Sequence, residues 1–350
     1  MNTVHITATR SYDVRIGSGL LDQIGSHAAA IKKVKKACIV SDHNVWPLYG
    51  ESAKKSLLNA GLEAVEFVFP AGEESKNPQT YFNLLNFLAE NHLTRTDLIV
   101  ALGGGVVGDL AGFAAATYLR GIPFIQVPTT LLAAVDSSVG GKTAIDLPAG
   151  KNLVGAFYQP SLVLCDIDCL NTLPTDIFRD GCAEVIKYGV LYDPDLFAHL
   201  TENGLNFDRE RVITRCVELK RNVVAEDEFD TGARMKLNLG HTIGHGVEAQ
   251  SHFGISHGKA VAIGMAIVSR AGASCGICEE SAKDAVLHIL EEFGLPCSCD
   301  FSAESLYCSA LSDKKRSGGT VNLIIPERIG FCRIAPTPVE EIQSFIKAGL

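Results

Sequence analysis

Short apolar runs alternate with helical stretches along the first half of the chain. The runs are rich in β-branched residues and bounded by Gly, Pro or Asp, which is typical of buried strands. They lie at residues 36–42, 64–70, 97–105, 123–130 and 162–167, and the helical stretches between them lie at 51–61, 77–91 and 108–119. This alternation predicts a Rossmann-like α/β domain, with a mostly parallel sheet and helices on both faces.

The pattern changes after about residue 172. Helical periodicity then dominates, and only residues 320–334 read as a hairpin; the helical segments are 173–193, 208–228, 238–258, 258–278 and 280–296. We therefore expect two domains, an α/β domain at residues 1–172 and a mainly α-helical domain at residues 173–350.

Composition and charge narrow the class of protein. The chain has 350 residues, of which 47% are apolar and 20% charged, as in a globular protein. Its net charge is −9 and its longest basic block is residues 32–36, so we expect no nucleic-acid partner, although a local basic pocket for a small anion is compatible with the sequence. No apolar stretch reaches the roughly 20 residues that span a bilayer, and residues 1–14 alternate like a strand rather than forming a signal peptide. We expect a soluble, cytoplasmic protein without membrane association.

The eleven cysteines are an odd number scattered along the chain, which predicts reduced, mostly buried thiols. Cys275 and Cys278 have the spacing of half a zinc ribbon. Because they continue an apolar helical run, we interpret them as packing residues of that helix.

A glycine turn follows the third predicted strand. Gly103, Gly105 and Gly108 are in G-x-G-x-x-G register between a strand and a helix, the context of a dinucleotide-binding turn. The motif alone is a weak signal, and a generic turn is the alternative. No carboxylate lies about 20 residues further on, where a ribose-binding acid is expected. Asp42 and Glu73 follow earlier strands, and we expect the ribose to meet these acids instead.

Residues 136–143 nearly match a triphosphate-binding loop. Asp136 replaces its first glycine, and the segment does not clearly run from a strand into a helix, so we reject that interpretation. Lys142, Lys151 and Asn152 nevertheless cluster in a glycine-rich loop that suits a phosphate or carboxylate. Solvated loop lysines are the alternative.

Four histidines, His241, His245, His252 and His257, lie within 17 residues. The first two have the spacing of a zinc-protease helix, but Thr242 occupies the position of the protease glutamate, which argues against proteolysis. Histidines so close together, interleaved with glycines, indicate a metal site, with ligands among His241, His245, His257 and a carboxylate elsewhere. The best carboxylate is Glu184, which lies among small and apolar residues three positions before Lys187. Histidines with only structural roles are the alternative.

Seven segments together resemble the 3-dehydroquinate synthase family. They lie at residues 103–121, 127–146, 150–160, 181–189, 237–249, 256–265 and 313–319, in that family's order and spacing, and cover nearly the whole chain. The resemblance implies a dehydroquinate synthase-like fold and a reaction of the shikimate pathway, which leads to the aromatic amino acids. In it, 3-deoxy-D-arabino-heptulosonate 7-phosphate becomes 3-dehydroquinate and phosphate, by transient oxidation with NAD, β-elimination of phosphate, re-reduction and intramolecular aldol closure.

The resemblance also implies a role for each matching residue. NAD would bind in the α/β domain and the metal and substrate mainly in the helical domain. The metal, usually zinc with cobalt as an alternative, would be held by Glu184, His241 and His257. NAD would be held by Asp42, Glu73, Lys76, Gly104, Gly105, Val106, Val107, Gly108, Asp109, Thr129, Thr130, Lys142, Lys151, Cys169, Leu170, Asn171 and Thr172. The phosphorylated keto-sugar acid would meet Arg120, Asp136, Lys142, Asn152, Lys187, Lys220, Arg234, Asn238, His245 and Lys314 (chosen over Lys315).

Within that substrate set, the catalytic residues would be Lys142, Lys187, Lys220, Arg234, Asn238 and His245. Arg120 would reach the substrate of a neighbouring subunit, which implies a homodimer. His252 would have neither a metal nor a substrate role.

Three alternatives share these features. Other sugar-phosphate cyclases make valiolone or inosose rings, metal-dependent alcohol and glycerol dehydrogenases stop at net hydride transfer, and a non-catalytic module would only bind NAD or metal. The cationic and polar set of Lys142, Lys220, Arg234, Asn238 and His245 favours dehydroquinate formation, because this substrate carries both a carboxylate and a phosphate.

Overall fold

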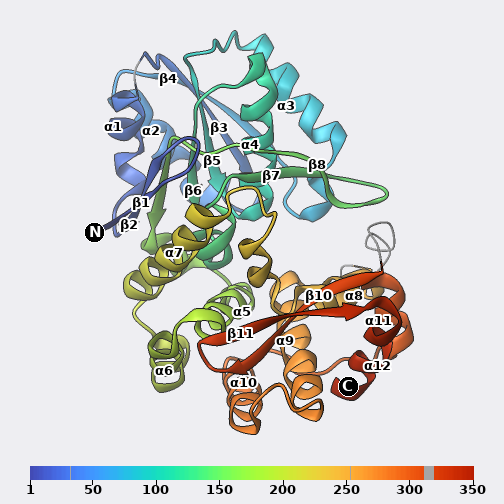
Figure 1. The fold of residues 1–350 in the computed structure, drawn as a ribbon. Helices are drawn as coiled ribbons and strands as arrows, with labels where there is room; N and C mark the ends of the chain where they lie inside the picture. The colour runs from blue at the N-terminus through green and yellow to red at the C-terminus, as the bar shows by residue number, and fades with distance from the viewer. Residues whose placement is uncertain (32, 253, 311–318) are drawn as a thin grey trace. The chain divides into compact units, whose positions relative to one another are not determined.

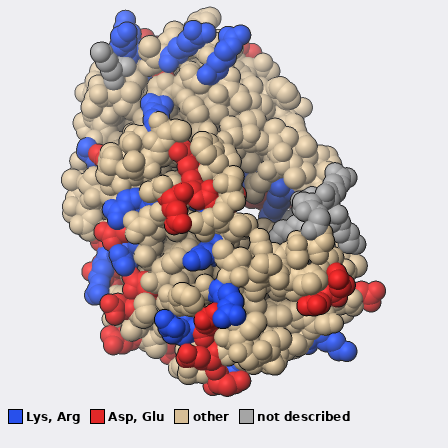
Figure 2. Space-filling model, in the orientation of Figure 1, with Lys and Arg blue, Asp and Glu red and all other residues tan. Residues whose placement is uncertain are grey.

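The structure is a computed structural model that describes residues 1–31, 33–252, 254–310 and 319–350 (Figure 1). By its internal contacts the chain forms two compact units. The first is Met1–Leu173 with Arg209–Phe229, and the second is Pro174–Asp208 with Asp230–Leu350. Over the described ranges, every helix is too short or too polar to cross a bilayer. On the face drawn in Figure 2, basic side chains are interspersed with acidic ones.

The first unit is built on a seven-stranded sheet in the order β1-β2-β9-β6-β5-β3-β4. Its first two strands pair antiparallel, and all the other neighbours pair parallel. The strands are β1 (Asn2–Ile6), β2 (Tyr12–Gly17), β3 (Lys36–Asp42), β4 (Glu63–Phe69), β5 (Leu98–Gly103), β6 (Phe124–Pro128) and β9 (Leu162–Asp166). The predicted Rossmann-like, mostly parallel sheet is confirmed.

Helices cover both faces of this sheet because both faces of its central strands are apolar. In β3, Ile39 faces one hydrophobic core and Val40 the other, as the two-residue period of a strand requires. The core on the side of Ile39 includes residues of α1 (Ile24–Ala30) and α2 (Glu51–Asn59). The core on the side of Val40 includes residues of α3 (Pro78–Glu90) and α4 (Gly105–Thr117).

One helix beyond residue 172 belongs to the first unit. Helix α7 (Arg209–Glu226) packs against β1 and against the short helix η5 (Ala133–Ser137). A single division of the chain at residue 172 would group α7 with the second unit, whereas its contacts group it with the first. Helical periodicity identifies the apolar face of a helix but not the surface that covers it.

The glycine-rich segment expected as a loop is a hairpin. Strands β7 (Lys142–Leu147) and β8 (Gly150–Phe157) pair antiparallel, with a bulge between Ile145 and Leu147. The loop prediction was wrong here because glycines lack the side chains by which a strand is recognised in a sequence. Gly155 is nevertheless required by the packing of the hairpin. A Cβ on Gly155 would lie 2.1 Å from the carbonyl oxygen of Thr143 on the paired strand.

The second unit is mainly helical, as predicted, and the late hairpin is also confirmed. Its elements are α5 (Thr175–Tyr192), α6 (Pro194–Asn203), α8 (His241–Gln250), α9 (His257–Ser274), α10 (Glu280–Glu292), α11 (Ala303–Ala310), β10 (Thr320–Arg328), β11 (Phe331–Pro338) and α12 (Val339–Gly349). Helix α9 contacts α5, α8, α10 and α12 and is almost entirely buried.

The cysteine pair does not continue α9, contrary to the expectation from the sequence. The helix ends at Ser274, and Gly276 turns the chain with a φ of 70°. Cys275 is exposed, whereas Cys278 is buried beyond the turn. Apolar residues that continue past a helix end obscured this boundary.

Candidate active site

Most of the NAD residues expected from the sequence lie at or just after the carboxyl ends of parallel strands, and Lys142 and Lys151 lie on the β7–β8 hairpin. The next strand along the chain after β3 is β4, which lies next to β3 on one side of the sheet. The next strand after β5 is β6, which lies next to β5 on the opposite side. The strand order thus reverses between β3 and β5, and such a switch point is where open α/β sheets bind ligands. Asp42 ends β3, Gly103 ends β5, and Thr129 directly follows β6.

The glycine turn after β5 has the geometry of a dinucleotide site. Helix α4 begins at Gly105, so its first backbone N–H groups are available to an anion. A Cβ on Gly108 would lie 2.7 Å from Gln126 Oε1 of β6, so glycine permits the close approach of helix and strand. Thr129 Oγ1 is buried and lacks a hydrogen-bond partner within the described part of the chain. A free backbone terminus beside a buried, unpartnered hydroxyl fits a bound dinucleotide.

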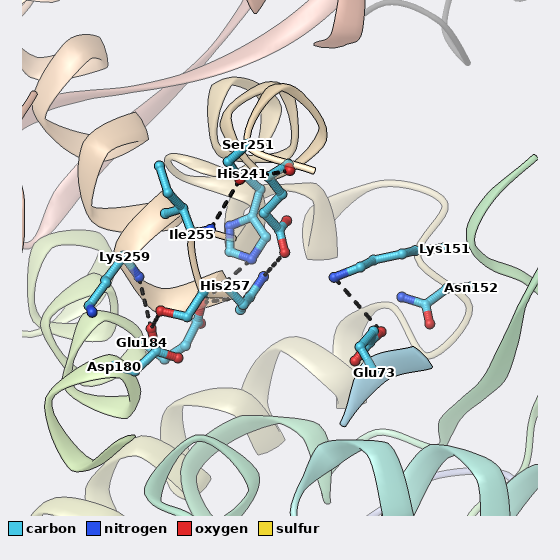
Figure 3. Close-up of polar contacts among 12 residues, drawn as sticks. Glu73, Lys151, Asn152, Asp180, Glu184, His241, Ser251, Ile255, His257 and Lys259 are labelled. Carbon is cyan, nitrogen blue, oxygen red and sulfur yellow. Dashed lines mark hydrogen bonds and ion pairs between the residues drawn. The ribbon is translucent and has the colours of Figure 1, made fainter. Parts of the chain in front are cut away.

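A buried lysine gathers three acids beside this turn. Lys76 Nζ lies 2.8 Å from Glu73, 3.2 Å from Asp109 and 3.7 Å from Asp146. Burial raises the pKa of Asp109 from 3.8 to about 6, although Lys76 opposes the shift. The acids around Lys76 raise its pKa despite its burial, so this lysine remains charged. Lys151 points toward Glu73, with its Nζ 3.8 Å from the carboxylate (Figure 3).

The first unit also contains several expected substrate residues. Lys220 of α7 is buried and donates to the Oδ1 and carbonyl oxygens of Asp136, both at 2.7 Å. Arg120 is exposed and has a left-handed φ of 68°. Lys142 is exposed at the start of β7. Asn152 accepts a hydrogen bond from Lys76 Nζ at 2.8 Å, so it joins the acidic cluster.

The residues expected near the end of β9 form a short helix, η6 (Ile167–Thr172). Cys169 and Leu170 are buried, and the carbonyl of Cys169 accepts from Tyr49 Oη at 2.9 Å. Asn171 accepts from Arg209 Nη1 at 2.6 Å. These contacts with Tyr49 and Arg209 hold η6 at the edge of the sheet where the parallel strands end.

The second unit brings together Glu184, His241 and His257. Their ligand atoms all lie within 4.8 Å of one another, and they form the one such group found among the described residues. Glu184 is fully buried on α5, and the Nε2 atoms of both histidines lie 3.5 Å from its Oε1 (Figure 3). Lys187, one turn along α5, forms an ion pair with Oε2 of the same carboxylate. Two histidines and a carboxylate are a common catalytic zinc set, so these residues fit a divalent metal.

Contacts on the far side of each imidazole direct Nε2 toward Glu184. His241 Nδ1 lies 3.1 Å from the carbonyl oxygen of Leu239, and His257 Nδ1 lies 3.6 Å from Glu248 Oε1. Such outer contacts fix the orientation of metal-binding histidines. Burial lowers the pKa of His241 to about 3, and the charge of Lys187 adds to the effect. Burial alone would lower the pKa of His257, but Glu184 and Glu248 outweigh it and raise that pKa to about 10. A bound cation would take the place of this proton.

Glycines explain how three helices approach closely enough to form the triad. A Cβ on Gly258 would lie 1.9 Å from the carbonyl oxygen of Asp180 on α5. A Cβ on Gly264 would lie 2.0 Å from the carbonyl oxygen of Gly240, which precedes α8. The Asp180 side chain also accepts from Lys259 N at 3.0 Å in the first turn of α9. Helix α9 is thereby fixed next to both partner helices.

The remaining expected residues of this unit surround the triad to different degrees. His245 is exposed, and its ring centre lies 5.6 Å from that of His241. Arg234 is buried in the short helix η8 (Ala233–Asn238), and Asn238 at its end is exposed. His252 is exposed, in a left-handed conformation after α8. Lys314, like Lys315, lies outside the described residues.

The sequence did not point to three acids that contact expected site residues or their neighbours, namely Asp146, Asp180 and Glu248. Glu248 follows His241 by seven residues, so it shares a face of α8, and this spacing could have identified it. Asp146 contacts Lys76 and Asp180 contacts Lys259, both distant in sequence, and the local pattern carries no signal for these contacts.

The fold and the triad define the class of protein. A crystal structure of 2-deoxy-scyllo-inosose synthase with carbaglucose-6-phosphate, NAD+ and Co2+ matches with a TM-score of 0.90 and 28% identity over 100% of both chains. A 2-epi-5-epi-valiolone synthase from Streptomyces hygroscopicus, with NAD+ and Zn2+ bound, matches with a TM-score of 0.88 and 26% identity over 98% of each chain. An iron-containing alcohol dehydrogenase shares the fold, with a TM-score of 0.69, 17% identity and coverage of 97% of each chain. The chain has the fold of the sugar-phosphate cyclases.

The particular family follows from the sequence matches. Residues 66–180 match the family model of the 3-dehydroquinate synthase N-terminal domain, and residues 181–316 match that of its C-terminal domain. The chain is 44% identical to 3-dehydroquinate synthase of Enterococcus faecalis, over 97% of this chain and 96% of the relative. It is 46% identical to that of Pelobacter propionicus, over 95% of each chain. The chain belongs to the 3-dehydroquinate synthase family.

The activity predicted from the sequence is confirmed by these matches. The enzyme converts 3-deoxy-D-arabino-heptulosonate 7-phosphate to 3-dehydroquinate and phosphate. The cyclases that make other rings are only 26–28% identical, so the alternative of another cyclase is not favoured. The net dehydrogenase is not favoured either, because the dehydrogenase relative shares only the fold.

Proposed function

We propose that this enzyme performs its reaction with NAD held at the carboxyl ends of β3 and β5 and with one divalent metal, zinc or cobalt, held by Glu184, His241 and His257. The observation that carries the proposal is the triad, in which two partly buried imidazoles present Nε2 to one buried carboxylate. When bound, NAD would take and return a hydride, and the metal would hold and acidify substrate hydroxyl groups. The NAD and the Co2+ or Zn2+ of the matched cyclases support this choice of cofactors.

The chain's own residues bind and orient a strongly anionic substrate. Its phosphate and carboxylate together carry about three negative charges. Lys142, Lys187, Lys220 and Arg234 supply cations that can pair with these groups, within a protein of net charge −9. Lys187 and Lys220 are buried and already have partners, Glu184 and Asp136, so their side chains are oriented before substrate arrives.

The other residues of the proposed substrate set bind hydroxyl groups or orient the cations. Asn152, Asn238 and His245 offer hydrogen bonds to substrate hydroxyl groups, and Asp136 orients Lys220. Lys314 completes the proposed substrate set. The proposed NAD residues are those that follow the carboxyl ends of the parallel strands, from Asp42 to Thr172, together with Lys142 and Lys151 on the hairpin.

We further propose a homodimer, in which Arg120 contributes to the site of the neighbouring subunit, and a cytoplasmic location. Arg120 is exposed, and its side chain extends from a strained turn. The eleven cysteines are all free thiols, as expected in a reducing compartment.

One experiment tests the proposal as a whole. The heptulosonate phosphate is supplied with metal and with NAD at about one-tenth of the substrate concentration, while phosphate release and NADH absorbance are followed. We expect many phosphates per NAD and no lasting NADH, because the hydride is returned in each turnover. Accumulation of NADH would contradict the proposal. Phosphate release that does not depend on added or bound NAD would equally contradict it.

A variant separates the metal site from the NAD site. His257→Ala should abolish turnover and metal retention but leave NAD binding measurable by calorimetry, because the NAD residues lie in the other unit. Full metal content in this variant would overturn the ligand assignment. His252→Ala is the matched control and should retain both metal and activity.

A further inference from the structure

Asp146 occupies the bulge of the β7–β8 hairpin. Ile145 pairs with Val154 and Leu147 pairs with Gly150, so the register shifts at the residue between them. The backbone N–H of Asp146 donates to the carbonyl oxygen of Lys76 at 2.7 Å. Bulges often redirect a side chain next to a functional site. This bulge fastens the hairpin to the segment that holds the buried lysine.

The Asp146 side chain holds the backbone of Asn152. Its Oδ1 accepts from the Asn152 N–H at 2.7 Å. Asn152 has a φ of 56°, a left-handed conformation that is uncommon outside glycine and that needs support from its surroundings. The same Asn152 accepts from Lys76 Nζ through its side chain at 2.8 Å. Asp146 therefore sets the direction in which the amide group of Asn152 points.

Asp146 also lies beside the lysine that pairs with the acid expected to meet the NAD ribose. Its Oδ1 lies 3.7 Å from Lys76 Nζ, which in turn lies 2.8 Å from the Glu73 carboxylate. The same Nζ donates to the side chain of Asn152 at 2.8 Å. Asp146 therefore holds the backbone of Asn152 and contacts the Lys76 segment through both its backbone and its carboxylate.

We propose that Asp146 is a positioning residue of the reaction, which holds the substrate-binding Asn152 and the segment of Lys76 in one fixed arrangement through its hydrogen bonds to the backbones of both. This inference rests on the proposed function for the roles of Asn152 and Lys76. Asp146 itself touches neither ligand in this account. It acts by joining the hairpin to the Lys76 segment.

The bonding pattern singles out two informative substitutions. Asp146→Asn keeps a side-chain oxygen that can accept from the Asn152 N–H. Asp146→Ala removes this acceptor, whereas both variants keep the backbone N–H that donates to Lys76. Asp146→Asn should therefore behave like the wild type, whereas Asp146→Ala should release Asn152. Glu90→Ala, which removes an exposed acid at the end of α3 in the same unit, is the control.

The first measurement is steady-state kinetics by phosphate release. For Asp146→Ala we expect KM for the heptulosonate phosphate to rise about tenfold, as loss of the hydrogen bond that positions Asn152 produces, and the Kd for NAD to stay within about twofold of the wild type. For Asp146→Asn we expect both constants within about twofold of the wild type. Equal impairment of the two variants would overturn the proposal, since charge rather than bonding would then be responsible. A wild-type KM in Asp146→Ala would overturn it as well.

The second measurement does not depend on activity. Hydrogen exchange of the peptide covering residues 147–157 should be faster in Asp146→Ala and unchanged in Asp146→Asn and Glu90→Ala, because only the first loses the acceptor for the Asn152 N–H. Unchanged exchange in Asp146→Ala would overturn the positioning role. If the wild type released no phosphate, the proposed function would fail, while the exchange result would still decide the role of Asp146.

Discussion

Replacing Gly258 by Ala tests whether close packing of α9 against α5 is what places His257 beside Glu184. A Cβ at position 258 would lie 1.9 Å from the carbonyl oxygen of Asp180 and 2.6 Å from its carbonyl carbon. Carbon–oxygen contacts are ordinarily no shorter than about 3.3 Å, so the two backbones must separate by more than about 1 Å. Both atoms at the clash belong to a helix backbone, so a side-chain rotation cannot relieve it.

The displacement acts directly on the metal ligand, because His257 is the preceding residue. Metal–ligand distances tolerate shifts of only about 0.2 Å. We therefore expect the Kd for zinc to rise at least about tenfold, with turnover falling in parallel. Overpacking of a buried contact also costs about 1–3 kcal/mol, so the free energy of unfolding should fall by this amount. Zinc affinity is measured by competition with a chromogenic chelator, and unfolding by urea titration.

Gly276→Ala is a matched control in the turn just beyond the other end of the same helix. Gly276 has a φ of 70°, and an added Cβ would have nothing within 4 Å. Left-handed strain should cost about 1–2 kcal/mol of stability, similar to the cost at Gly258, but without moving a ligand. We expect this variant to lose stability and keep its zinc affinity. Equal zinc affinities in the two variants would refute the view that backbone approach at Gly258 positions the triad.

Three further predictions concern other parts of the site. Glu248→Gln should weaken zinc binding about 10–100-fold by removing the carboxylate 3.6 Å from His257 Nδ1, and a chelator-competition Kd equal to that of His252→Gln would contradict this. Arg120→Ala mixed with Lys187→Gln should recover part of the activity that each lacks alone, because each hybrid dimer can contain one complete site; no recovery would show that Arg120 acts within its own chain. Asp109 has its pKa raised on folding from 3.8 to about 6 by burial, so its contribution to stability is fully present below about pH 4 and is lost as the pH rises through about 6. Urea titrations should therefore show that the free energy of unfolding of Asp109→Asn, relative to that of the wild type, rises by about 1 kcal/mol from pH 5 to pH 8. The same relative free energy at both pH values would contradict the burial argument.

The sequence identifies the central sheet because its strands are apolar on both faces. Residues such as Ile39 and Val40 face opposite cores, so the run shows no alternation and reads as a buried parallel strand. The β7–β8 hairpin lacks this signal, since its glycines replace the side chains by which a strand is recognised. Helix α7 belongs to the first unit through its contacts with β1 and η5, such as that between Lys220 and Asp136, which only the fold reveals.

The candidate site divides in the same way between local and distant signals. His241 and Glu248 share one face of α8, so their association was available from spacing alone. Glu184 could be suggested only as an acid among apolar neighbours, because its approach to the histidines depends on packing between helices. Asp146 carries no local signal of any kind. Its importance comes from a bulge that directs its backbone and side chain to two different segments.

Glycines connect these observations, since within each unit two elements approach closely where a side chain is missing. Gly108 lets α4 approach Gln126, and Gly258 lets α9 approach the backbone of Asp180. Neither glycine has a positive φ, so conformational freedom is not the reason for its presence. Clustered histidines alone are compatible with a structural role, but histidines next to glycines that remove a Cβ clash indicate helices packed closely enough to share a ligand. The glycines of residues 238–258 are thus as informative about the metal site as the histidines themselves.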